Sequence, residues 1–116
     1  MEWTTERRYR RYEDWTTEEK QAIQENMAKS PWHTHYHVEP KAGLLNDPNG
    51  FSYFDGKWIL FYQNFPFGAA HGLKSWVQTE SDDLVHFTET GVTLLPDTEL
   101  DSHGAYSGSA MQFDDK

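Results

Sequence analysis

One carboxylate in this chain has surroundings that suit it for chemistry. Asp47 lies in the run Asn46-Asp47-Pro48-Asn49-Gly50, directly after the apolar pair Leu44-Leu45. Asp first, Pro second and Gly fourth are typical of a type I β-turn, so we expect a tight turn over 47–50 at the end of a sheet. A carboxylate fixed there could attack a sugar carbon, or it could cap its own turn by accepting bonds from the following amides.

A second group of residues alternates along the chain and could bind a metal. His33, His35, His37 and Glu39 would share one face if 33–39 were a strand, and zinc or nickel could then bind. Same-face neighbours lie about 7 Å apart, however, so three imidazoles rarely reach one ion without another segment. Surface histidines, or packing near Tyr36, are the alternative.

The elements that must position these groups change in type along the chain. Thr16-Thr17-Glu18-Glu19 fits a capping box with Thr16 as N-cap, and predicts one short helix within 15–29. After Pro31 the pattern predicts strands joined by short turns, with a hairpin through Asp55-Gly56 and a link through Asp82-Asp83. The expected strands are Gly50–Phe54, Lys57–Gln63, Trp76–Ser81, Phe87–Thr93 and the start of a fifth over Gly108–Phe113.

This order of elements indicates a mainly β fold. Four antiparallel strands in succession fit one blade of a β-propeller or one sheet of a sandwich. A lone blade leaves an apolar face and two strand edges uncovered, which predicts self-association or packing against more chain.

Composition narrows the class of protein. The chain has 116 residues, no cysteine and a mean hydropathy of -0.87, and it lacks both the apolar run of about 20 residues that crosses a bilayer and the core of a secretory signal. We therefore expect a cytoplasmic protein without membrane partners. Residues 42–116 carry three Lys/Arg against eleven Asp/Glu, which argues against nucleic acid as a partner. The arginines between Arg7 and Arg11 are interpreted as a solvated mixed-charge face.

Four motifs together resemble glycoside hydrolase family 32, and in particular its bacterial intracellular β-fructofuranosidases. They are Asn46-Asp47-Pro48-Asn49-Gly50, Phe61-Tyr62-Gln63, Ser81-Asp82-Asp83-Leu84-Val85-His86-Phe87 and Tyr106-Ser107-Gly108-Ser109-Ala110, in this order. The resemblance runs from about Trp32 to the end. It implies a helical segment over 1–31, then over 32–116 the first blade and the start of the second of a five-bladed catalytic propeller.

The resemblance also implies site residues and a reaction, hydrolysis of sucrose or sucrose 6-phosphate with retention. Asp47 would be the nucleophile, with Leu44, Leu45 and Asn46 lining the same pocket. Gln63 would hydrogen-bond the fructosyl ring, while Tyr106 and Ser107 would touch the substrate. The partner is thus a small sugar, and no cofactor or metal is implied.

Two departures from the family concern the part of the pocket that does not hold fructose. Leu44-Leu45 stands where family members often have Trp-Met, and Trp76-Val77-Gln78-Thr79 where they often have Trp-Gly-His-Ala. A glucose 6-phosphate portion would need a cation, for which His71 and Lys74 are the nearby candidates. The alternative for both is an ordinary solvated loop charge.

A retaining glycosidase also needs a second carboxyl group about 5 to 5.5 Å from the nucleophile. The family supplies it in a Glu-Cys motif and stabilises the transition state with an Arg-Asp-Pro motif, and neither occurs in this sequence. We therefore expect a fragment that is inactive alone. A non-catalytic carbohydrate-binding module, using Trp58 and Trp76 to stack on sugars, is the alternative, although packing better explains such residues.

Overall fold

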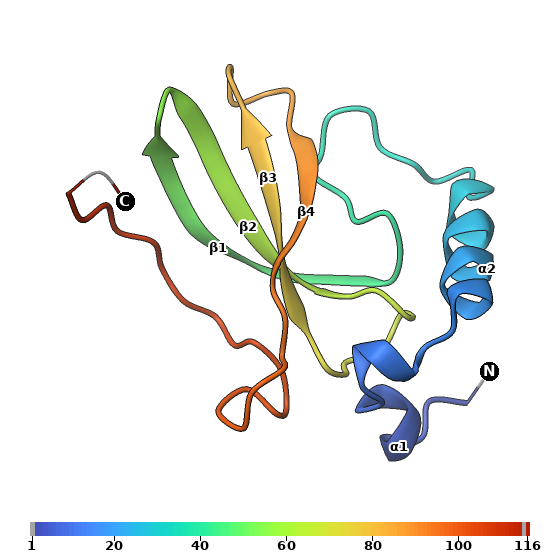
Figure 1. The fold of residues 1–116 in the computed structure, drawn as a ribbon. Coiled ribbons are helices and arrows are strands. Elements are labelled where there is room, and N and C mark those ends of the chain that lie inside the picture. Colours follow the sequence, from blue (N-terminus) through green and yellow to red (C-terminus); the bar gives the residue numbers. More distant parts are fainter. Residues whose placement is uncertain (1, 115) are drawn as a thin grey trace.

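The computed structural model describes residues 2–114 and 116, and within them the fold is mainly β. Four strands form one antiparallel sheet in the order β1-β2-β3-β4, preceded by short helices (Figure 1). None of the described helices is long and apolar enough to cross a membrane. The elements are α1 (Thr5–Arg8), a 3-10 turn η1 (Tyr12–Asp14), α2 (Thr17–Ala28), β1 (Leu44–Phe54), β2 (Lys57–Phe65), β3 (Ser75–Ser81) and β4 (Thr88–Leu94).

The elements with local signals form as predicted. In α2 the Glu19 amide donates to Thr16 Oγ1 at 3.1 Å, and the Thr16 amide donates to Glu19 Oε2 at 2.9 Å, which completes the capping box. The β1–β2 hairpin turns at Asp55-Gly56, whose φ angles of 49° and 78° suit a two-residue hairpin loop.

The link between β3 and β4 is organised by one carboxylate. Asp83 Oδ1 accepts from the amides of Val85 and His86 at 2.9 and 2.8 Å, and Asp83 Oδ2 lies 2.6 Å from His86 Nδ1. These contacts, the His86 side chain first among them, hold the pKa of Asp83 well below its usual range.

The core lies at one end of the sheet, where the N-terminal arm (residues 2–29) packs against β2 and the residues after it (Figure 1). Trp15, Phe65 and Phe67 are buried together, and the rings of Trp15 and Phe67 stack with centroids 4.2 Å apart. The N-terminal arm and the sheet thus share one hydrophobic cluster, and Leu44 at the start of β1 packs against it.

Two of the arginines of the arm, Arg7 and Arg10, do not lie on the solvated face that we expected, whereas Arg11 is exposed and pairs with Glu13 at 3.4 Å. The guanidinium groups of Arg7 and Arg10 lie 5.5 and 4.7 Å from the ring centroid of Trp15, and Arg10 also pairs with Glu19 at 3.0 Å. A planar guanidinium stacks well on an indole, so these residues are half-buried against the core.

The predicted tight turn over 47–50 is wrong, because this stretch belongs to β1. Pro48 pairs with Tyr62 and Asn49 with Phe61, with register shifts on both sides of this pair. β1 is an edge strand in which a proline is tolerated, and the bulges absorb the irregular residues.

Two further strand expectations are also wrong. Gly108–Phe113 forms no strand, since no neighbouring strand of the described residues pairs with it. Residues 33–39 form bends and coil rather than a strand.

Two glycines allow the entry to β1 to be tested against a matched control. Gly43 and Gly56 have nearly the same φ, 79° and 78°, but a Cβ at Gly43 would lie 2.0 Å from Phe65 O whereas a Cβ at Gly56 meets nothing within 4 Å. We expect Gly56→Ala to cost about 1 kcal/mol through left-handed strain alone, and Gly43→Ala at least about 2 kcal/mol more. Urea unfolding of the two variants measures the difference, and equal losses would contradict the close approach at Gly43.

Candidate active site

Asp47 lies near the start of β1 with its side chain exposed. Its Oδ2 accepts a hydrogen bond from Ser107 Oγ at 2.7 Å, and its backbone oxygen accepts one from Asn49 Nδ2 at 3.0 Å. Within the described residues, no backbone amide donates to the Asp47 carboxylate. The carboxylate is therefore not used to cap its own chain.

Ser107 belongs to a crossing segment, residues 104–108, that lies over one face of the sheet. Its backbone is held by β1, β2 and β3 through one side chain from each: Gln63 Nε2 donates to Ala105 O at 2.8 Å, Trp76 Nε1 donates to Tyr106 O at 3.1 Å, and Asn49 Oδ1 accepts from the Gly108 amide at 3.1 Å. These bonds bring Ser107 to Asp47, 60 residues earlier in the chain.

Asn46 carries a polar atom whose hydrogen-bonding capacity is unused. Its Oδ1 is buried and has no hydrogen-bond partner among the described residues. A buried acceptor without a partner is costly, and a donor from a ligand or a water molecule would satisfy it. This atom belongs to the residue that directly precedes Asp47.

The structure brings together Asp47 and Ser107 by direct contact, and joins Gln63 to them through the crossing segment. Gln63 is buried, with 3% of its surface exposed, and its bond to Ala105 uses one of its two amide N–H groups. Tyr106 is 76% exposed. Leu45 is half-buried and pairs with Asn64 across β1 and β2, whereas Leu44 packs against the core cluster.

Sequence reasoning missed two residues that hold this arrangement. Asn49 has a place in the motif as a turn residue, yet in the structure its side chain binds both Asp47 and Gly108. Trp76 was considered as a stacking platform, yet it packs on Phe61 and donates its indole N–H. Trp76 is half-buried, and an indole N–H in such a position usually finds an acceptor, which is a signal that the residue type itself carries.

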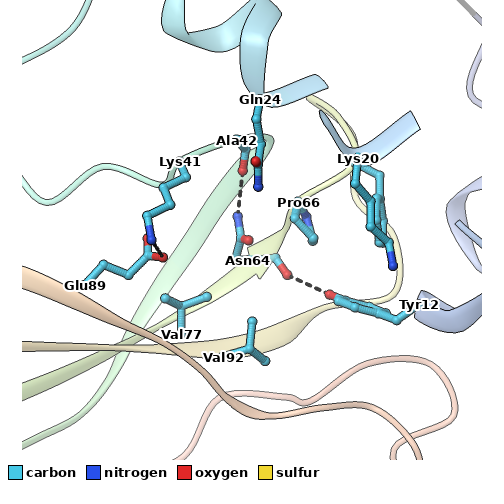
Figure 2. A pocket seen from close by; sticks show the side chains of 11 residues that line it. Tyr12, Lys20, Gln24, Lys41, Ala42, Asn64, Pro66, Val77, Glu89 and Val92 are labelled. Carbon is cyan, nitrogen blue, oxygen red and sulfur yellow. Dashed lines mark hydrogen bonds and ion pairs between the residues drawn. The ribbon is translucent and has the colours of Figure 1, made fainter. Parts of the chain in front are cut away.

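The opposite face of the sheet has a cavity of about 230 Å³ between α2, the segment around Lys41 and the strands (Figure 2). Asn64 and Val77 line it, and their strand neighbours Gln63 and Trp76 contact the crossing segment on the other face, as strand alternation requires. In Figure 2 Lys41 points to Glu89, with Nζ to Oε1 at 2.9 Å.

Residues that line the cavity hold the backbone of the segment that leads into β1. Asn64 Nδ2 donates to the backbone oxygens of Ala42 and Leu44, both at 3.1 Å, and Tyr12 Oη donates to Leu73 O at 3.0 Å. Burial raises the pKa of Tyr12 to about 12, so its hydroxyl stays protonated as a donor. The Asp47 side of β1 is thus supported from both faces.

The chemistry available to the described residues is that of one carboxylate with hydrogen-bonding neighbours. Of the glutamates that could supply a second carboxyl group, Glu89 is engaged with Tyr62 and Lys41 on the opposite face, and Glu80 accepts from Gln78. Asp47 can act as a nucleophile in this arrangement, but proton donation to a leaving group requires another residue.

Residues 33–39 do not form the metal site that we considered as an alternative. His33 Nδ1 lies 2.7 Å from Glu39 Oε1 and its Nε2 lies 3.0 Å from Met27 O, so both ring nitrogens are engaged. No group of three or more potential metal-ligating side chains occurs in the part of the chain that the structure describes.

Comparison with known proteins gives a consistent result. The model of the glycosyl hydrolases family 32 N-terminal domain matches residues 37–116. The chain is 72% identical over 109 residues to a sucrose-6-phosphate hydrolase of Streptococcus mutans, covering 94% of this chain and 23% of the relative. It is 56% identical over 114 residues to a sucrose-6-phosphate hydrolase of Lactococcus lactis, covering 98% and 24%.

Solved structures of glycoside hydrolase family 32 enzymes superpose on the chain. The sucrose-6-phosphate hydrolase from Lactobacillus gasseri superposes with a TM-score of 0.94 at 52% identity, covering 97% of this chain and 23% of that one. A Bombyx mori GH32 β-fructofuranosidase variant in complex with sucrose gives 0.66 at 32% identity, covering 86% and 22%. The mainly β fold, a four-stranded sheet like the first blade of a propeller, is confirmed. The chain spans about a quarter of the length of these relatives.

The His33–Glu39 contact predicts a specific titration. The Glu39 carboxylate raises the pKa of His33, and His33 lowers that of Glu39. The pair therefore stabilises the loop fully at pH values between the unfolded pKa of Glu, about 4.3, and the unfolded pKa of His, about 6.5. The stabilisation is lost at lower pH, as the pH falls through the lowered pKa of Glu39. It is also lost at higher pH, as the pH rises through the raised pKa of His33. NMR titration should show His33 with a pKa above its ordinary value. Glu39→Gln should lower it, and an unchanged His33 in that variant would contradict the pairing.

Proposed function

Because the chain belongs to glycosyl hydrolase family 32, we propose that it is the N-terminal part of a retaining β-fructofuranosidase that hydrolyses sucrose 6-phosphate or sucrose. The products would be fructose and glucose 6-phosphate, or fructose and glucose. Relatives named sucrose-6-phosphate hydrolase and a β-fructofuranosidase structure with sucrose support this substrate class.

The observation that carries the proposal is the state of Asp47. Its carboxylate is exposed, is contacted by Ser107 Oγ at 2.7 Å, and accepts no bond from a described backbone amide. In the proposed reaction one Asp47 oxygen attacks the anomeric carbon of the fructosyl group, and the bond to the glucosyl oxygen breaks. Water then releases fructose by attack on the same carbon, which gives overall retention.

The neighbours of Asp47 supply hydrogen bonds. We assign Asn46 Oδ1, the buried acceptor without a partner among the described residues, to a substrate hydroxyl. Ser107 orients the nucleophile, and Gln63 holds the crossing segment while its second N–H is available to the fructosyl ring. Tyr106, exposed beside Ser107, and Leu45, at the start of β1, complete the proposed contacts.

The proton for the leaving oxygen would come from a carboxyl group outside the described sheet. We therefore propose that the active enzyme is a longer polypeptide, in which further blades supply this group and cover the edges of β1 and β4. The partial coverage of the relatives and the engagement of Glu89 on the opposite face support this proposal.

The nucleophile is tested in a polypeptide of the relatives' length that carries this segment. Asp47→Asn keeps the shape of the side chain but removes its charge, so turnover should fall roughly a thousandfold or more while sugar binding is retained. Rapid acid quenching of the unsubstituted enzyme with substrate should add one fructosyl group to the peptide that contains Asp47, as mass spectrometry can show.

The matched control is Asp55→Asn in the β1–β2 turn. Asp55 is exposed and has a φ of 49°, which asparagine also tolerates, so this variant should keep normal turnover. Unchanged turnover in Asp47→Asn, or a fructosyl group on another peptide, would refute the assignment.

A further inference from the structure

A second cavity, of about 160 Å³, adjoins the candidate active site on the face that carries the crossing segment. Three separate parts of the chain form its walls: Tyr9 from the N-terminal arm, the loop 71–74 before β3, and residues 103–106. Gln63 and Tyr106 also line it, and Tyr106 is followed by Ser107, which contacts Asp47. The crossing segment thus contributes both to the wall of the cavity and to the contact with the proposed nucleophile.

The cavity is basic although the surrounding chain is acidic. Lys74, His71 and His103 line it, and no Asp or Glu of the described residues does. Residues 42–116 contain three Lys/Arg against eleven Asp/Glu, so a basic cavity is unexpected from composition. Lys57, another of these three cations, is neutralised by Asp82 at 2.8 Å.

Lys74, in contrast, forms no ion pair with the described residues. Asp101, the nearest acid in sequence to the 103–106 wall, has Oδ1 bound to the amide and hydroxyl of Thr98 at 2.8 and 2.7 Å. A cation without a carboxylate partner among the described residues, in the lining of a concave site, is suited to an anionic ligand.

The walls of the cavity are held by backbone bonds. The Ala105 amide donates to Lys74 O at 2.8 Å, and the Leu73 amide donates to Arg8 O at 2.8 Å. Gly104, with a φ of 126°, lets the chain approach so closely that a Cβ there would lie 3.1 Å from the Lys74 amide nitrogen. The rings of Tyr9 and His103 are in edge contact, with centroids 5.7 Å apart.

We propose that this cavity binds the phosphate of a phosphorylated disaccharide, and that Lys74 thereby gives the enzyme its preference for sucrose 6-phosphate over sucrose. The inference rests on the proposed function, because it assumes that fructose binds at Asp47 and Gln63 and that the glucosyl part extends past Tyr106 towards Lys74. Lys74 supplies the fixed charge, while the imidazoles of His71 and His103 and the hydroxyl of Tyr9 supply further donors.

The test compares two substrates in the polypeptide of the relatives' length. Lys74→Gln keeps a long side chain and a donor but removes the charge, so kcat/KM for sucrose 6-phosphate should fall roughly 10- to 100-fold. The value for sucrose, which has no phosphate, should change by no more than about twofold, and Lys74→Arg should restore most of the preference. Lys57→Gln, the same substitution outside this cavity, is the control and should leave the ratio unchanged.

Inhibition identifies the ligand directly. Glucose 6-phosphate should inhibit the unsubstituted enzyme competitively and more strongly than either glucose or inorganic phosphate, and Lys74→Gln should remove this difference. If inorganic phosphate inhibited the enzyme as strongly as glucose 6-phosphate, the cavity would be assigned to free phosphate, and the substrate assignment would be overturned.

The proposal also fails if Lys74→Gln lowers kcat/KM by the same factor for both substrates, or if it leaves kcat/KM unchanged for both. If that variant does not fold, His103→Gln must show the same selective loss for the phosphorylated substrate, or the proposal fails. This failure can be told apart from a failure of the nucleophile assignment, because in the latter case Asp47→Asn would retain turnover of both substrates.

Discussion

The site depends on one physical constraint, the attachment of residues 104–108 across the sheet. Gln63, Trp76 and Asn49 come from three different strands, and each makes a side-chain hydrogen bond to the backbone of this short segment. Gln63 and Ala105 are both buried, so their bond is shielded from competing water. Because the segment is held at three points, the residues within it and next to it are placed as well: Ser107 reaches Asp47, and His103 reaches the wall of the basic cavity.

The end of β2 determines both faces of the sheet. Gln63 and Asn64 are neighbours in sequence, and strand alternation sends their side chains to opposite sides. Gln63 binds the crossing segment, whereas Asn64 binds the backbone of Ala42 and Leu44 at the entry to β1. Two adjacent amide side chains thus fix the two segments that meet at Asp47. The polar character of this strand end has a structural reason on one face and a proposed functional one on the other.

The sequence predicted those features that depend on local contacts. The capping box at Thr16, the Asp55-Gly56 hairpin and the four strand cores follow from residues a few positions apart. The turn over 47–50 was wrong because pairing of Pro48 with Tyr62 overrides the local turn preference, and the fifth strand failed for want of a pairing partner. The placement of Arg7 and Arg10 on Trp15 depends on packing of the whole arm. The contact of Ser107 with Asp47 spans 60 residues, and only the resemblance of the motifs, not their spacing, pointed to it.

The long separation between the N-terminal arm and its partners has a consequence during synthesis. Tyr12 donates to Asn64 and Leu73, which lie 52 and 61 residues further along the chain. A nascent chain emerges from the ribosome with its N-terminus first, so the arm leaves the exit tunnel well before these acceptors exist. Until they arrive, Trp15 lacks Phe65 and Phe67, and its apolar surface faces water or a chaperone. Synthesis of Leu73, close to the end of the connection between β2 and β3, is therefore the point at which the growing polypeptide can first close its core.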